Sequence, residues 1–186
     1  MGGQHGTLQN GVTFAPGQLG QAFQFDGLDD YVTLPDSAAL DTLGSAASLE
    51  LWVKPELDPT APQPTFRLLF ARRNPNLLEG FSVGLTETGR LLVVVQSTTT
   101  PSSSFWSASG AVSAGVFQHL AVSVDLVAAS LHAYVNGQDV PLVVINGPGT
   151  LSGVFTNVDE GYLGRWQVAG RAGERRGAGL RQGSRG

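Results

Sequence analysis

The stretch SLELWVKP, residues 48–55, decides the fold class of this chain. Three apolar residues alternate with three others and a proline ends the run: Leu49, Leu51 and Val53 against Glu50, Trp52 and Lys54. Successive side chains of a strand point to opposite faces, so a period of two is typical of a half-buried strand. The three apolar residues are expected to face a core, and Trp52 is expected to pack beneath a loop rather than to stack on a ligand.

Similar short runs recur along the chain: FSVGL, LLVVV, HLAVSVD and LHAYV. Turn residues separate them, as at Thr88-Gly89 and Asn136-Gly137. No amphipathic run has helical length, so the pattern predicts an all-β fold, an antiparallel β-sandwich or jelly roll. The segment STTTPSSSFWSASG, residues 97–110, is expected to be a long loop or a ragged edge strand.

Length and composition indicate one soluble domain. The chain has 186 residues, 41% of them hydrophobic and 14% charged, which suits a single packed core. No run approaches the roughly 18 apolar residues of a membrane helix, so no membrane insertion is expected. There is no cysteine, and the start of the chain has no signal-peptide pattern, so an export signal would have to lie outside it.

The charge is unevenly distributed. From Arg165 onward, six arginines against Glu174 give +5, while the preceding five basic and fourteen acidic residues give −9, in agreement with the net charge of −4. An acidic body repels phosphate, so only the tail could attract nucleic acid, and no specific nucleic-acid partner is expected.

The longest informative stretch is GQHGTLQNGVTFAPGQLGQAFQFDGLDDYVTLPDS, residues 3–37. It resembles the opening of laminin G-like jelly-roll domains of the concanavalin A-like lectin and glucanase superfamily. SLELWVKP, FQHLAVSVD, LHAYVNGQ and GYLGRW resemble later signatures of the same family. The resemblance implies a concanavalin A-like jelly roll over residues 1–166. Within it, Phe23 and Phe25 lead to a reversal at Asp26-Gly27 and a returning strand at 31–34, which predicts a hairpin.

The two ends depart from the family pattern. An earlier strand is expected to be missing, so the domain is N-terminally incomplete, and residues 167–186 form a Gly/Arg-rich tail that is expected to be disordered. Permitted codons for RRGAGLRQGSR, residues 175–185, encode Asp-Glu-Val-Arg-Val-Tyr-Asp-Arg-Ala-Leu from the second base. This decapeptide resembles the closing strand of the family. We therefore interpret the tail as a frameshift product and expect the chain to be marginally stable alone.

The resemblance implies a non-catalytic binding module of a larger extracellular or cell-surface protein, with a carbohydrate or protein partner. A hydrolase or lyase acting on polysaccharide is the first alternative, and a structural spacer without ligand is the second. Glu56-Leu57-Asp58 begins like the E-x-D-x-(x)-E arrangement of glucanases, but Thr60 and Ala61 stand where a second glutamate is needed. Neighbouring prolines favour a loop there, so no catalytic residue is predicted.

Two groups of side chains are candidates for binding. Asp26, Asp29 and Asp30 offer oxygen ligands that suit calcium, although they also suit a turn whose amides they accept. The ligand-binding candidates are expected in or near loops, where polar and aromatic groups suit a sugar: Arg72, Arg73, Asn74 and Trp106.

Overall fold

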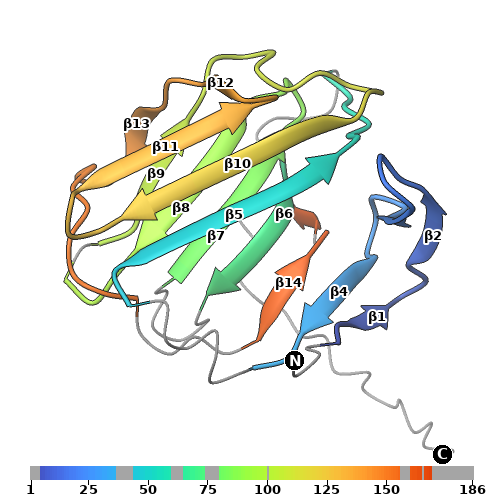
Figure 1. The fold of residues 1–186 in the computed structure, drawn as a ribbon, viewed down its shortest axis with the longest axis horizontal. Helices are drawn as coiled ribbons and strands as arrows, with labels where there is room; N and C mark the ends of the chain where they lie inside the picture. Colours follow the sequence, from blue (N-terminus) through green and yellow to red (C-terminus); the bar gives the residue numbers. More distant parts are fainter. Residues whose placement is uncertain are drawn as a thin grey trace, which may run out of the picture.

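The structure is a computed structural model, and it describes residues 5–36, 44–59, 65–73, 80–99, 101–155, 160–164 and 166–168. Every regular element in these residues is a β-strand, which confirms the all-β prediction. Two antiparallel sheets lie face to face, one in front of the other (Figure 1). Within the described ranges, no helix is long and apolar enough to cross a membrane.

The front sheet has four strands in the order β12-β11-β10-β5. Its longest ladder joins β10 to β5, with Leu120 opposite Leu51 and Val122 opposite Leu49. The run SLELWVKP therefore forms a strand with the predicted alternation. The strand bounds are Ala46–Val53 for β5, Gln118–Asp125 for β10, Ser130–Val135 for β11 and Gln138–Asp139 for β12.

The back sheet has nine strands in the order β1-β4-β14-β6-β7-β8-β9-β13, and β15 also pairs with β6. Neighbours along the chain pair in succession from β6 to β9, whereas β4 and β14 come from distant parts of the sequence. The bounds are β1 Thr7–Gln9, β4 Tyr31–Leu34, β6 Thr65–Arg73, β7 Gly80–Thr86, β8 Leu91–Gln96, β9 Ser103–Trp106, β13 Val143–Asn146, β14 Gly161–Leu163 and β15 Trp166–Val168.

The N-terminal hairpin differs from the predicted one. Strand β3 (Gln21–Gln24) pairs with β2 (Thr13–Pro16), whereas β4 pairs with β1 and β14. The turn after β3 therefore carries the chain from one sheet to another instead of closing a ladder. Gly27, with a φ of 76°, supplies the left-handed conformation that this change of direction needs.

The core lies between the sheets and is most completely closed over β7 and β8. The alternating side chains of β10 that point inward are fully buried, and so are their counterparts on β7 and β8. Burying such apolar side chains stabilises a fold by about 1.5–3 kcal/mol each. The main residues of this core are Val83, Leu85, Leu91, Val93, Val95, Leu120, Val122 and Val124.

Two predicted turns are confirmed. Asn136 and Gly137, with φ of 51° and 76°, join β11 to β12 in the conformation that tight hairpins require. Gly89, with a φ of 69°, closes the turn between β7 and β8. A side chain at Gly89 would collide with the carbonyl oxygen of Val112, so the position also needs a close backbone approach.

The Ser/Thr-rich segment differs from the expected loop or ragged edge strand. The Ser/Thr-rich segment contains β9, which is not an edge strand because β13 pairs with it on one side and β8 on the other. Strand β15 runs to Val168, two residues past the boundary expected at residue 166. The predicted tail from residue 169 onward lies outside the described residues.

Candidate functional site

The acidic turn between β3 and β4 brings three carboxylates together. One oxygen from each of Asp26, Asp29 and Asp30 lies within 4.8 Å of the other two. Much of the arrangement serves the turn itself, since the amide of Leu28 donates to Asp26 Oδ1 (2.8 Å) and the amide of Asp26 donates to Asp30 Oδ2 (3.0 Å). Asn10 also donates from its side chain to the carbonyl of Asp29 (2.8 Å).

One carboxylate oxygen of the turn accepts none of these hydrogen bonds. Asp30 is only 5% exposed, and its Oδ1 has no hydrogen-bond partner. A buried carboxylate oxygen without a partner is costly, and a bound cation would remove that cost. The donors are all hard oxygens, so these residues fit calcium. The carboxylates of Asp26 and Asp29 are exposed and could complete the coordination from the solvent side.

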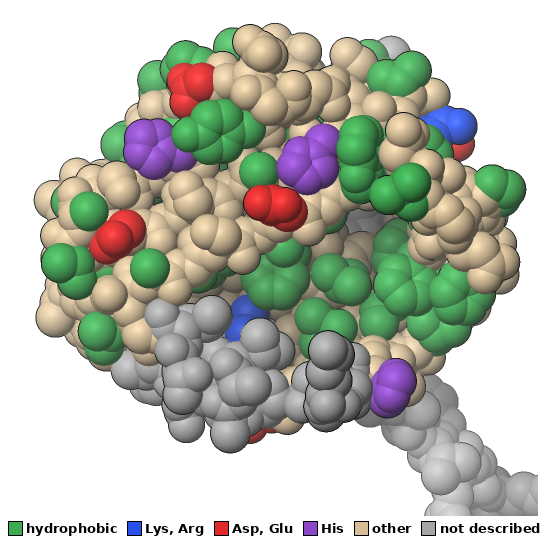
Figure 2. Space-filling view, in the orientation of Figure 1, with side chains coloured by type: hydrophobic (Ala, Val, Ile, Leu, Met, Phe, Trp, Pro, Cys, Tyr) green, Lys and Arg blue, Asp and Glu red, His purple; other side chains and the backbone are tan. Residues whose placement is uncertain are grey.

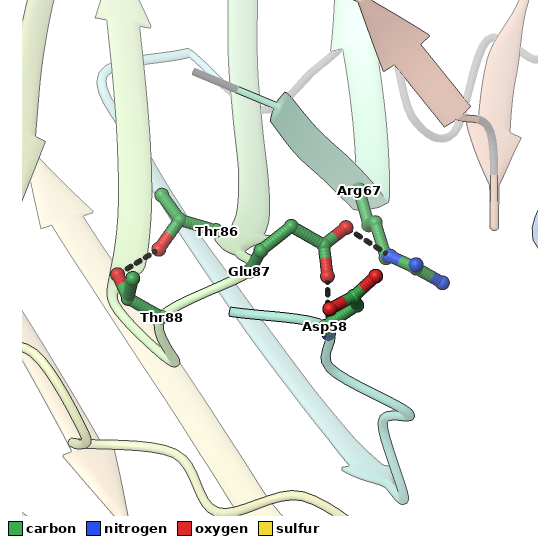
Figure 3. Close-up of polar contacts among 5 residues, drawn as sticks. All are labelled: Asp58, Arg67, Thr86, Glu87 and Thr88. Carbon is green, nitrogen blue, oxygen red and sulfur yellow. Dashed lines mark hydrogen bonds and ion pairs between the residues drawn. The ribbon is translucent and has the colours of Figure 1, made fainter. Parts of the chain in front are cut away.

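A buried ion pair supports the β7–β8 turn beside this region (Figure 3). Glu87 is 2% exposed, and its Oε1 accepts from Arg67 Nε at 2.7 Å while its Oε2 accepts from the amide of Asp58 at 2.7 Å. The guanidinium of Arg67 also lies beside Gly27 of the acidic turn. Glu87 thus connects the segment after β5, strand β6 and the β7–β8 turn, and both of its oxygens are engaged.

The two acids of the candidate glucanase motif do not lie on a strand. Glu56 and Asp58 follow the end of β5 and belong to no strand, as the neighbouring prolines predict. Two catalytic carboxylates must face one sugar from a common surface. Here the backbone of Asp58 is used to hold Glu87, and Glu87 itself is paired with Arg67.

Of the predicted ligand-binding residues, Arg72 and Trp106 lie apart in the described part of the chain. Arg72 lies in β6, is 3% exposed and contacts Asp36 (3.4 Å), and Trp106 ends β9 with the guanidinium of Arg90 over its ring at 5.7 Å. Three strand spacings, about 14 Å, separate β6 from β9. Arg73 ends β6, and Asn74 lies outside the described residues.

A cluster of aromatic and acidic side chains lies on the outer face of the front sheet. Trp52 and His119 are directly opposite each other in the β5–β10 ladder, with ring centroids 5.3 Å apart. Trp52 is 45% exposed, which contradicts the expectation that it packs beneath a loop. Glu50, one step along the same face, places Oε2 3.8 Å from His119 Nε2.

This face continues across the sheet in rows set by strand pairing. Glu50 is opposite Ala121, which is opposite Tyr134, which is opposite Asp139. His132 stacks near Tyr134, with centroids 6.5 Å apart and an angle of 24°. The small Ala121 thus lies between two aromatic pairs. We call these residues the outer-face patch: Glu50, Trp52, His119, Ala121, His132, Tyr134 and Asp139.

Figure 2 shows histidine, acidic and hydrophobic side chains side by side on this face. None of the patch residues is Lys or Arg. The sequence contained a signal for the patch, because Trp52 alternates in phase with Glu50 and Lys54 and therefore shares their exposed face. What the sequence did not contain was the register that brings His119 and Tyr134 onto the same surface.

Two antiparallel sheets packed face to face around one apolar core define a jelly-roll β-sandwich. Residues 25–171 match the laminin G-like family described as the concanavalin A-like lectin/glucanases superfamily, and the chain belongs to this family. No curated protein sequence matches the chain.

Solved structures with the same fold include domains of botulinum neurotoxins and of laminin. One is from botulinum neurotoxin type C, whose cell entry depends on interaction with two ganglioside molecules. It is 13% identical to this chain with a TM-score of 0.63, and the match covers 92% of this chain and 40% of the toxin chain. The binding domain of botulinum neurotoxin DC in complex with rat synaptotagmin II has 13% identity, a TM-score of 0.61 and coverage of 90% and 41%. Mouse laminin α1 domains LG4-5 have 18% identity, a TM-score of 0.53 and coverage of 82% and 35%. The chain therefore spans about 40% of the two toxin chains, and these likenesses concern the fold.

Proposed function

We propose that this chain is a non-catalytic binding module that recognises a neutral glycan on the outer-face patch. The observation that carries the proposal is the exposed ring of Trp52 beside His119. An exposed indole offers a flat apolar face on which a sugar ring can stack, and a few polar groups around it can fix the orientation of the sugar. Glu50 and Asp139 supply acceptors for sugar hydroxyls.

The charge of the patch selects the class of glycan. Glu50 and Asp139 are both exposed in the patch, and Lys54, the exposed residue two positions after Trp52, lies at its border. Acidic side chains repel sulfated or carboxylated sugars and accept hydrogen bonds from uncharged ones. A neutral oligosaccharide is therefore the preferred ligand. The alternative ligand of such a binding module is a protein partner with an apolar or weakly basic surface.

The toxin structures of the same fold support a binding role, because one toxin depends on ganglioside molecules for cell entry and the other toxin domain is in complex with synaptotagmin II. By analogy with them, we place this module in a larger protein that acts outside the cell or at its surface. This step rests on shared fold and therefore on analogy.

We further propose that the acidic turn holds calcium. Asp30 would supply its buried oxygen, and Asp26 and Asp29 would supply exposed ones. The cation would fix the turn that links β3 to β4 and would stabilise the folded state by mass action.

Incubation with a panel of neutral and acidic polysaccharides separates the three candidate functions. A binding module is retained by some polysaccharides without releasing any product. New reducing ends or unsaturated products would show a hydrolase or lyase instead. A folded protein retained by none of them would be a spacer. Retention by sulfated glycans alone would contradict the assignment of the patch to neutral sugars.

A further inference from the structure

The outer-face patch contains a second aromatic group besides Trp52 and His119. His132 and Tyr134 alternate on β11 and therefore point to the same side of the sheet. Their rings are nearly parallel, with an angle of 24° between them and centroids 6.5 Å apart. His132 is exposed and Tyr134 is half-buried, so a ligand on this face can contact both rings.

The register of the strands sets the distance between the two aromatic groups. Trp52 is directly opposite His119 of β10. Tyr134 is directly opposite Ala121, which lies two residues further along β10 and on the same face. Trp52 and Tyr134 are thus on strands that flank β10, with a backbone distance of about 12 Å. A pyranose ring is close in size to an aromatic side chain, so one sugar cannot cover both groups.

Small side chains occupy the surface between the two aromatic groups. Ser123 lies two residues beyond Ala121 on β10, and it is opposite Ser48 of β5. Alanine and serine side chains extend less far from a sheet than tryptophan, histidine or tyrosine side chains. A sugar can therefore lie over Ala121 without displacing a larger side chain. The hydroxyls of Ser48 and Ser123 can donate and accept hydrogen bonds, as the hydroxyls of a neutral sugar do.

Each aromatic group has an acidic side chain beside it. Glu50 places Oε2 3.8 Å from His119 Nε2, and Asp139 is opposite Tyr134 in the β11–β12 ladder. Both acids are exposed, and a carboxylate accepts hydrogen bonds from sugar hydroxyls. Each group thus combines an apolar ring with an acceptor, which is the combination that can hold a sugar in one orientation.

The two groups are separate sites on one continuous surface. Strands β5, β10 and β11 lie side by side in the front layer, so a ligand that reaches both groups must cross the strands (Figure 1). Figure 2 shows two histidine side chains over this layer, each beside a hydrophobic side chain and with other surface between them.

We propose that the outer-face patch binds an extended linear glycan, with one sugar unit against Trp52, another against Tyr134 and an intervening unit over Ala121. This inference rests on the proposed function and adds the shape and the minimum length of the ligand. A β-1,4-linked chain of glucose or mannose has the required shape, because its alternate units lie on one line and present the same face. A coiled glycan leaves the surface before it reaches the second group. The second contact forms within the bound complex and therefore increases the affinity.

The dependence of affinity on chain length tests the proposal. The probes are β-1,4-linked gluco-oligosaccharides and manno-oligosaccharides, from monosaccharide to hexasaccharide, titrated into the full 186-residue chain by calorimetry. In at least one series, affinity is expected to rise at least about tenfold between the disaccharide and the tetrasaccharide. Malto-oligosaccharides, which contain the same glucose in a coiled chain, should show no such rise.

Substitutions then identify the side chains that produce the rise. Tyr134→Ala should abolish it, so that the tetrasaccharide binds no more tightly than the disaccharide. Tyr134→Phe keeps the ring and should retain the rise, as should Val143→Ala on β13 of the other sheet. If Tyr134→Ala does not fold, the length series on the unchanged chain keeps the test decisive.

The outcomes separate this inference from the proposed function. Equal affinities at every chain length, or a rise that a folded Tyr134→Ala protein retains, would overturn the inference and leave a glycan site at Trp52. Failure of both β-1,4-linked series to bind would also overturn it. Retention of the chain on a different neutral polysaccharide would then keep the proposed function, whereas retention on none would end both.

Discussion

Glu87, which is 2% exposed, forms an ion pair with Arg67, whose Nε lies 2.7 Å from Glu87 Oε1. The pair joins the β7–β8 turn to β6, and the second oxygen of Glu87 holds the amide of Asp58 after the end of β5. One carboxylate thereby connects the front sheet to the back sheet at the end that lies beside the acidic turn.

Replacing Glu87 should therefore lower stability more than replacing an exposed glutamate. Glu87→Ala leaves the Asp58 amide without its acceptor and Arg67 without its partner, and Arg67 is one-third exposed, so water compensates part of the loss. We expect a loss of about 1–3 kcal/mol in the free energy of unfolding. Chemical denaturation checks this against Glu56→Ala, which should change stability by less than about 0.5 kcal/mol. Equal effects of the two substitutions would mean that the buried pair contributes little.

Calcium should raise the melting temperature, because it would bind the acidic turn only in the folded state. Asp29→Asn and Asp30→Asn should each reduce this rise, with the larger effect at Asp30, whose Oδ1 is buried without a partner. Asp139→Asn, on the distant strand β12, is the matched control and should leave the rise intact. A melting curve that is the same in calcium and in chelator would show that the three aspartates only shape the turn.

The basic tail should bind nucleic acid weakly and without sequence preference. The five arginines of residues 167–186 attract phosphate, but this tail has no aromatic residues on which bases could stack. Electrophoretic mobility shifts with single- and double-stranded probes should therefore disappear near physiological salt. A complex that survives that salt concentration would restore the tail as a nucleic-acid-binding arm.

Restoring the second reading frame should stabilise the chain. Replacing residues 175–184 by the decapeptide would supply a closing strand whose two valines can add to the buried apolar surface, and we expect a melting temperature about 10 °C higher. The same replacement with both valines changed to aspartate is the control. Sequencing the encoding DNA gives an independent check, because codons that cannot produce the decapeptide would end the frameshift interpretation.

The sequence predicted the fold more completely than the site, for identifiable reasons. Alternation in SLELWVKP and the Asn136-Gly137 turn are local signals, and both were confirmed. The pairing of β4 with β14 joins segments about 130 residues apart, so no local pattern indicates it. Arg72 is the second-last residue of β6, and its burial could not be inferred from the sequence alone. The outer-face patch depends on the register between β5 and β10, which the separate strands do not encode.

The central claim is that Trp52 and its neighbours bind the ligand, and glycan-array binding by the wild-type chain and by Trp52→Ala tests it most directly. Trp52 is half exposed, so the substitution should change stability by less than about 1 kcal/mol, whereas Leu120→Ala in the core should cost about 2–5 kcal/mol. We predict that the wild-type chain binds neutral oligosaccharides, that Trp52→Ala weakens this binding at least about tenfold, and that Val143→Ala, at an exposed residue of β13, leaves it unchanged. Undiminished binding by a folded Trp52→Ala protein would contradict the account.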